Sequence, residues 1–196
     1  MKNSALLIVD LQNDFCPGGA LAVPEGDKVV PVLNEYISIF NEAGLPIYAS
    51  RDWHPVVTKH FKEYGGLWPP HCVQGTRGAE FHPALQLPPD TIILTKGEDP
   101  DKDSYSAFQA LDEGGRPFTE SLLEKGVDHL YAGGLATDYC VKASVLDAID
   151  EGFTVTLLTD AVRGVELEAG DSERALDEMT GKGALTSTID KVRRSS

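Results

Sequence analysis

The stretch ALLIVD at residues 5–10 sets the fold that we expect for this chain. Five apolar residues stand in a row, and Asp10 ends the run. A strand that is apolar on both faces is typical of a parallel sheet, which is covered by helices on both sides. This stretch therefore predicts a buried strand of an α/β protein, with a carboxylate at its carboxyl end.

The same kind of run recurs along the chain, and helical patterns separate the runs. Further strands are expected at 46–50, 91–95, 127–132, 153–158 and 184–188. Apolar residues at helical spacing lie in 29–40, 141–149 and 172–179, and Gly44 and Gly152 end the first two patterns. This alternation predicts a doubly covered parallel sheet. We expect a single domain over residues 1–190 and a polar tail at 191–196.

The composition of the chain disfavours several classes of partner and location. The 196 residues are 41% hydrophobic and carry a net charge of −14, which disfavours nucleic acid or an anionic membrane surface as a partner. The sequence contains no run of about 18 apolar residues, so we predict no membrane span. The N-terminus does not read as a signal peptide, so we expect a cytoplasmic protein. The three cysteines, Cys16, Cys72 and Cys140, are an odd number and favour free thiols.

A long segment, 52–89, interrupts the alternation and is a candidate binding loop. It begins with Asp52 and His54, whose spacing points both side chains the same way on an extended chain, and it also contains His60 and His71. A carboxylate with two or three imidazoles suits a divalent transition metal. His82 and His129 have no such neighbours, and we interpret them as ordinary histidines.

Polar residues also follow other strands. Asp10, Lys96 and the bend GGLATDYC at 133–140 come after separate strands, and in a parallel sheet the carboxyl ends share one edge. With Thr137 as the N-cap, Cys140 would lie in the first turn of a helix, where the dipole favours a thiolate. Each residue alone has a structural alternative: an inert buried cysteine, a capping aspartate, or an ion-paired lysine. Together they form a set for nucleophilic catalysis.

Several stretches together resemble the nicotinamidase/pyrazinamidase group of the isochorismatase-like cysteine hydrolases. They are VDLQNDFCPGGALAV at 9–23, SRDWHP at 50–55 with HF at 60–61, LWPPHCVQGTRGAEFHP at 67–83, TKGEDPDKDSYSAF at 95–108 and GGLATDYCVKASVLDA at 133–148. The resemblance implies a three-layer fold with a six-stranded parallel sheet. It also implies the catalytic triad Asp10, Lys96 and Cys140. An oxyanion hole is expected from the N–H groups of Ala136 and Cys140, with a cis peptide bond before Ala136.

The resemblance further implies a metal site and a pocket. The metal is one divalent ion, zinc first, with iron and manganese as alternatives. Asp52, His54 and His71 would hold it, and His60 or water would complete the shell. The implied pocket residues are Phe15, Leu21, Trp68, Tyr105, Leu135 and Ala136. Tyr139 occupies a position that histidine often holds in the family, and Leu135 one that a β-branched residue often holds. The resemblance therefore leaves the preference among similar substrates open.

The implied reaction is hydrolysis of nicotinamide, and of pyrazinamide, through a cysteine thioester in NAD salvage. Three alternatives remain at this stage. A related cysteine amidohydrolase would act on another small amide. Two histidines and a carboxylate are also the ligand set of non-haem iron oxygenases. A non-catalytic binding protein would have no reason to keep Asp10, Lys96 and Cys140 together. A homo-oligomer is compatible with the sequence.

Overall fold

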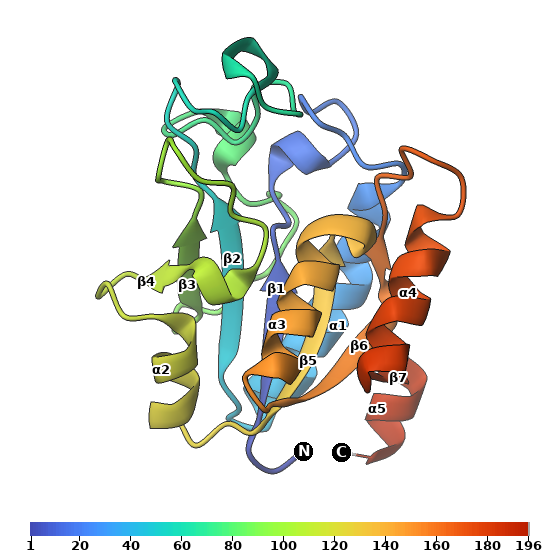
Figure 1. The fold of residues 1–196 in the computed structure, drawn as a ribbon. Helices are drawn as coiled ribbons and strands as arrows, with labels where there is room; N and C mark the ends of the chain where they lie inside the picture. The colour runs from blue at the N-terminus through green and yellow to red at the C-terminus, as the bar shows by residue number, and fades with distance from the viewer. Residues whose placement is uncertain (196) are drawn as a thin grey trace.

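One twisted sheet forms the centre of the computed structural model, which describes residues 1–195 (Figure 1). The strands lie in the order β4-β3-β2-β1-β5-β6-β7. Their bounds are β1 (Ser4–Val9), β2 (Ile47–Asp52), β3 (Ile92–Lys96), β4 (Leu111–Asp112), β5 (His129–Leu135), β6 (Thr154–Arg163) and β7 (Leu185–Ser187). Every predicted strand is present, and all six of them pair in parallel.

The expected count of six strands is wrong, because the sheet has seven. The additional strand, β4, is two residues long and pairs antiparallel with β3, so that Leu94 lies opposite Asp112. A short antiparallel strand can close the edge of a parallel sheet without a crossover helix. The sheet is therefore mostly parallel, with one antiparallel edge.

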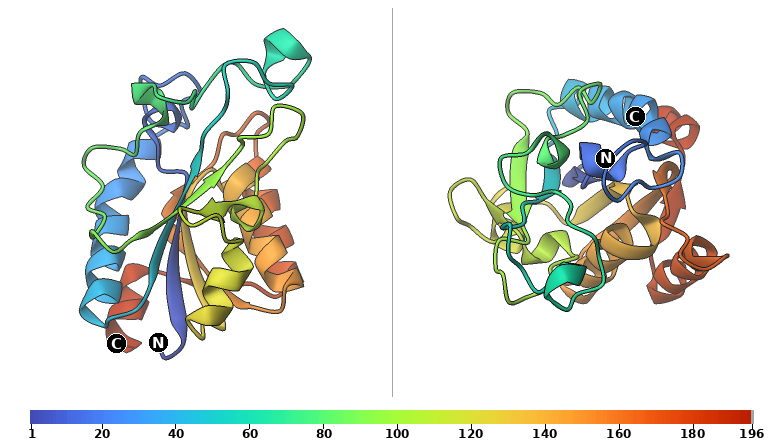
Figure 2. Two further views of the ribbon diagram at one scale, coloured as in Figure 1. Left: turned by 90° about the vertical axis from the view of Figure 1, so that its left-hand side faces the viewer. Right: turned by 90° about the horizontal axis from the view of Figure 1, so that it is seen from above.

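Helices cover both faces of the sheet (Figure 2, left). Helices α1 (Val29–Glu42) and α5 (Ile189–Ser195) lie on one face, and α2 (Phe118–Glu124), α3 (Lys142–Asp150) and α4 (Asp171–Lys182) lie on the other. Alternate residues of β1 enter the two apolar clusters: Leu7 packs toward α2, α3 and α4, and Ile8 packs toward α1. This alternation explains why the first apolar run is continuous.

The C-terminal residues differ from the expected polar tail. Helix α5 extends to Ser195, and Val192 in it is buried in the cluster on the α1 face. Residues 191–195 thus belong to the helical layer, and Ser196 lies outside the described residues. No helix within residues 1–195 is long and apolar enough to cross a membrane.

The second glycine of the GGLATDYC bend, Gly134, allows β5 to approach β1 closely. Gly134 has a φ of 125° and lies opposite Val9. A Cβ atom at Gly134 would lie 2.1 Å from the carbonyl oxygen of Val9. Only glycine fits there, and this close approach brings the segment after β5 next to Asp10. The long loop after β2 folds over the same edge of the sheet (Figure 1, top).

Candidate active site

A buried cation lies at the carboxyl ends of the central strands. The Nζ atom of Lys96, at the end of β3, lies 2.8 Å from Oδ2 of Asp10 and forms a second ion pair with Oδ1 of Asp52. Its distance to Sγ of Cys140 is 3.7 Å. All four side chains are buried. The predicted set Asp10, Lys96 and Cys140 is therefore brought together, and Asp52 joins it.

The surroundings give the two carboxyl groups different proton affinities. Burial raises the pKa of Asp10, and Lys96 only partly offsets this. Burial also acts against the charge of Asp52, but there Lys96 and the neighbouring histidines prevail, and the pKa of Asp52 is lowered. Two carboxyl groups whose pKa values are pushed apart can take different roles. Asp52 is suited to remain charged, and Asp10 is suited to exchange a proton.

Burial opposes the thiolate that a position in the first turn of a helix favours at Cys140. Burial raises the pKa of its thiol well above the ordinary value, although Lys96 acts in the opposite direction. Burial also disfavours the charge of Lys96, yet Asp10 and Asp52 outweigh it and raise the pKa of the ammonium group well above normal. These pKa directions favour a charged lysine beside a neutral thiol, so a base must take the thiol proton.

The nucleophile segment is also shaped differently from the prediction. Residues Thr137–Val141 form a π-helix, and Thr137 is not its N-cap. Ala136 precedes the π-helix, and its carbonyl accepts hydrogen bonds from the N–H groups of both Tyr139 and Val141. The expected cis peptide bond, between Leu135 and Ala136, is present. Single π-turns occur frequently at functional sites.

Two polar side chains that the sequence analysis missed hold the acidic residues. The hydroxyl of Ser50 donates to Oδ1 of Asp10 at 2.7 Å. The side-chain amide of Gln12 donates to the carbonyl of Asp52 at 2.7 Å and accepts from its N–H at 2.8 Å. Gln12 also donates to the carbonyl of Ala79. Gln12 thus prolongs the β1–β2 hydrogen bonding by one residue and fixes the backbone of Asp52.

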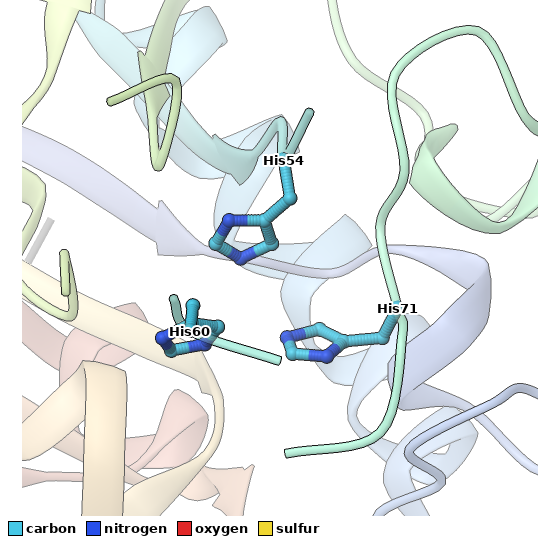
Figure 3. A group of neighbouring side chains, drawn as sticks. All are labelled: His54, His60 and His71. Carbon is cyan, nitrogen blue, oxygen red and sulfur yellow. The ribbon is translucent and has the colours of Figure 1, made fainter. Parts of the chain in front are cut away.

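Three of the predicted metal ligands face one another beside this ion-pair cluster (Figure 3). One ring nitrogen each of His54, His60 and His71 lies within 4.8 Å of the others, and all three rings are buried. Burial lowers the pKa of His71 to about 4 and also lowers that of His60, which favours neutral rings. The remaining expected ligand is Asp52. Its Oδ2 atom lies 3.7 Å from the Nε2 atom of His54.

The hydrogen bonds of the rings determine which nitrogens remain free. Nδ1 of His54 lies 3.1 Å from the carbonyl of Gly97, and Nδ1 of His71 lies 2.8 Å from that of Pro69. Nδ1 of His60 lies 2.5 Å from the carboxylate of Asp103. Oxygen acceptors require a proton on each Nδ1, so each neutral ring keeps its lone pair on Nε2.

Nε2 of His54 is buried and has no hydrogen-bond partner among the described residues. Such an orphaned acceptor is costly unless something binds it. Imidazole nitrogens with one carboxylate are the donors that zinc and iron prefer. The four side chains Asp52, His54, His60 and His71 therefore fit a divalent metal ion.

A small cavity connects the two clusters. Four of the pocket residues that the resemblance implies line it: Phe15, Leu21, Trp68 and Tyr105. Trp68 donates a hydrogen bond from Nε1 to the hydroxyl of Tyr105 at 3.0 Å. The remaining lining residues are Asp52, His60, His71, Tyr139, Cys140 and Val165. Cys140 and metal-binding groups thus open into the same aromatic space.

Other residues lie elsewhere or were missed. Leu135 and Ala136 pack in the cluster on the α1 face, and neither is among the cavity-lining residues. Val165 is a lining residue that no sequence signal indicated. The hydrogen bonds that bring it there run from the N–H groups of Val165 and Glu166 to the buried carboxylate of Asp138, 2.9 Å each. Such long-range contacts leave no local pattern.

Comparison with known proteins indicates one family. A model of the isochorismatase domain matches residues 4–191. The nicotinamidase of Escherichia coli (strain K12) is 44% identical, with 96% of each chain covered. The pyrazinamidase of Pyrococcus horikoshii, solved in complex with zinc, has a TM-score of 0.88 and 48% identity over 95% of this chain and 99% of that one. The PnC1 protein of L. infantum, solved in complex with nicotinate, has a TM-score of 0.85 and 32% identity over 95% and 93%.

Proposed function

The chain belongs to the isochorismatase family, and we propose that it hydrolyses nicotinamide to nicotinate and ammonia. Pyrazinamide, which has the same carboxamide on a similar ring, is proposed as a second substrate. The reaction would serve the salvage of NAD. A related reaction on another small amide is the alternative that the test below addresses.

The observation that carries this proposal is the shared cavity. Cys140 opens into it on one side, and His60, His71 and Asp52 open into it on another. The walls between them are aromatic: Phe15 forms a tilted ring contact with His71, and Trp68 forms an edge contact with Tyr139. A flat aromatic amide suits such a space, because its ring can pack on the walls while its polar ends reach the two clusters.

We assign the first half of the reaction to Asp10 and Cys140. The carboxylate of Asp10 takes the thiol proton, and the sulfur forms a bond to the carboxamide carbon. The N–H groups of Ala136 and Cys140 are proposed to hold the oxyanion, and losing one such donor typically costs about 3–4 kcal/mol of barrier lowering. Asp10 then gives its proton to the nitrogen of the amide, and the C–N bond breaks. Ammonia departs, and the acyl group remains on Cys140 as a thioester.

The second half reverses the proton path. Asp10, again a carboxylate, takes a proton from water as the water oxygen attacks the thioester carbon. The C–S bond breaks, and the proton on Asp10 returns to the sulfur. The product leaves as nicotinic acid, which gives its remaining proton to solvent and becomes nicotinate. Lys96 remains protonated throughout, because its two carboxylate neighbours raise the pKa of its ammonium group. Its charge stabilises the thiolate, which lies 3.7 Å away.

Zinc is the proposed metal, held by Asp52, His54, His71 and His60. When bound, the ion would offer a Lewis-acidic contact to the ring nitrogen of the substrate. On the protein side, Lys96 pairs with Oδ1 of Asp52, while Oδ2 faces His54. Asp52 therefore contacts the ion-pair cluster with one carboxylate oxygen and the histidine cluster with the other. Orientation of the amide toward the sulfur is the expected benefit, and it lowers the entropic part of the barrier.

The test is kcat/KM for nicotinamide, pyrazinamide and benzamide, with ammonia release as the readout. Benzamide keeps the ring size and the carboxamide but lacks the ring nitrogen. A site built around a polar partner rejects an analogue that lacks it, so benzamide should be slower by at least about tenfold. Efficient hydrolysis of unrelated small amides, with no turnover of nicotinamide, would favour the alternative that the protein is a related amidohydrolase with another substrate. Equal rates for benzamide and nicotinamide would leave the metal no role in recognition.

A further inference from the structure

His60 is held differently from the other two histidines of the metal cluster. Backbone carbonyls hold Nδ1 of His54 and His71. Nδ1 of His60 instead meets a side chain, the carboxylate of Asp103, at 2.5 Å. The ring of His60 is buried, whereas the side chain of Asp103 is 62% exposed. The orientation of His60 thus depends on a residue at the protein surface.

The contact with Asp103 decides what the ring of His60 can do. A carboxylate accepts only, so Nδ1 must carry the proton, and the lone pair of the neutral ring is then on Nε2. The ring stacks on that of His54 with centroids 4.6 Å apart and planes 20° from parallel. Without an acceptor at Nδ1, both the tautomer and the rotation of the ring would be free to change.

We propose that Asp103 is a positioning residue that makes His60 a protein ligand of the metal. The inference rests on the metal-containing amidohydrolase proposed above and deepens it. Histidine ligands usually donate their second ring N–H to an oxygen that orients them, and removal of that oxygen typically weakens metal binding by about 10–100-fold. Asp103 would supply this oxygen to the one ring that no backbone carbonyl holds at Nδ1.

The loop that carries Asp103 is tied to the His60 segment by other contacts as well. The N–H of Lys59 and the hydroxyl of Thr58 both donate to the carbonyl of Pro100. Lys59 also pairs with Asp101 at 2.7 Å, and both side chains are mostly exposed. Asp101 thus offers a matched control: the same loop, the same residue type and the same charge, but no contact with a histidine ring.

The experiment measures zinc release from the zinc-loaded protein into a chromogenic chelator. Asp103→Ala should release zinc at least about tenfold faster than the wild type. Asp103→Asn should fall between the two, because the amide oxygen still accepts a hydrogen bond but carries no charge. Asp101→Ala should release zinc at the wild-type rate. In a His60→Ala background, Asp103→Ala should add nothing, since its effect acts through the His60 ring.

The outcomes separate this inference from the proposed function. A wild type that binds zinc and hydrolyses nicotinamide, with unchanged release in Asp103→Ala, would overturn the role of Asp103 alone. Equal acceleration in Asp101→Ala, or in the His60→Ala background, would replace it with a general effect of the loop. A wild type that retains no zinc would overturn both the metal assignment and this inference. Because Asp103 and Asp101 are exposed, circular dichroism should show their single variants folded.

Discussion

Replacing Lys96 by methionine should destabilise the protein strongly and in a pH-dependent way. Methionine keeps much of the volume of lysine but removes the charge between Asp10 and Asp52. Both carboxylates are buried, and Lys96 is the cation that pairs with each of them. The carbonyl of Ser104 also loses a donor at 3.2 Å. The variant therefore leaves two buried acidic groups without a counter-charge.

The size of the effect follows from that burial. Removing one partner of a buried ion pair typically costs about 3–5 kcal/mol. A domain of this size is stable by only about 5–15 kcal/mol, so the loss is a large share. With an m value of about 2–3 kcal/mol per M, the midpoint of urea unfolding should fall by roughly 1–2 M. An exposed pair such as Lys182 with Asp150, also at 2.8 Å, is worth about 0–1 kcal/mol.

The direction with pH can be derived from Asp10. Burial already raises its pKa, and removal of Lys96 removes the main opposing charge, so the pKa of the folded state rises further above the unfolded value. A carboxyl group with a raised folded pKa stabilises the fold while it is protonated and ceases to do so as the pH rises through that pKa. The deficit of Lys96→Met should therefore be larger near pH 8 than near pH 5.

The assay is urea unfolding of chelator-treated wild type, Lys96→Met and Lys182→Met at both pH values. Chelation ensures that no metal offsets the charge of Asp52. Lys182→Met should resemble the wild type at both values. A loss of stability in Lys96→Met no larger than that in Lys182→Met, or a deficit that does not depend on pH, would show that Lys96 does not balance the charge of the two buried carboxylates.

Three further predictions concern the same site. Ser50→Ala removes the hydroxyl that favours the charged form of Asp10, so the acidic limb of the pH profile of kcat/KM should move to higher pH. Ser50→Thr keeps the hydroxyl and should leave this limb at its wild-type pH. His71→Ala should lower bound zinc below one equivalent by elemental analysis, whereas His82→Ala, outside the cluster, should not. Burial raises the pKa of both Cys16 and Cys140, but Cys140 opens into the cavity beside Phe15 and Trp68 and faces the ammonium group of Lys96. Iodoacetamide should therefore alkylate Cys140 before Cys16; equal rates in peptide mapping would count against this.

The parts of the fold that leave a local pattern could be predicted from the sequence. Strand β1 is recognisable because both of its faces are buried, which makes its apolar run continuous. Strand β4 was missed because two residues have no period, and their pairing with β3 is a contact between distant segments. Helix α2 was missed for a similar reason, since seven residues are barely two turns.

The candidate site divides in the same way. Asp10 and Lys96 were identified because a charged residue at the end of a buried strand stands out. Ser50 and Gln12 did not stand out, because polar neutral residues beside a strand are common. Asp103 lies in the polar run GEDPDKD, where nothing in the sequence distinguishes it from Asp99 or Asp101. Only the fold shows which of these carboxylates reaches His60.

Nicotinate formation by zinc-loaded wild type and Cys140→Ala tests the role of the Cys140 sulfur most directly. The substitution removes the sulfur but leaves Asp10, Lys96 and the histidine cluster in place. The wild type should form nicotinate and ammonia in equal amounts. The variant should bind nicotinamide, stay folded, and lose at least about 10³-fold in kcat, since no thioester can form. Nicotinate formation by Cys140→Ala at a rate near that of the wild type would contradict the central claim.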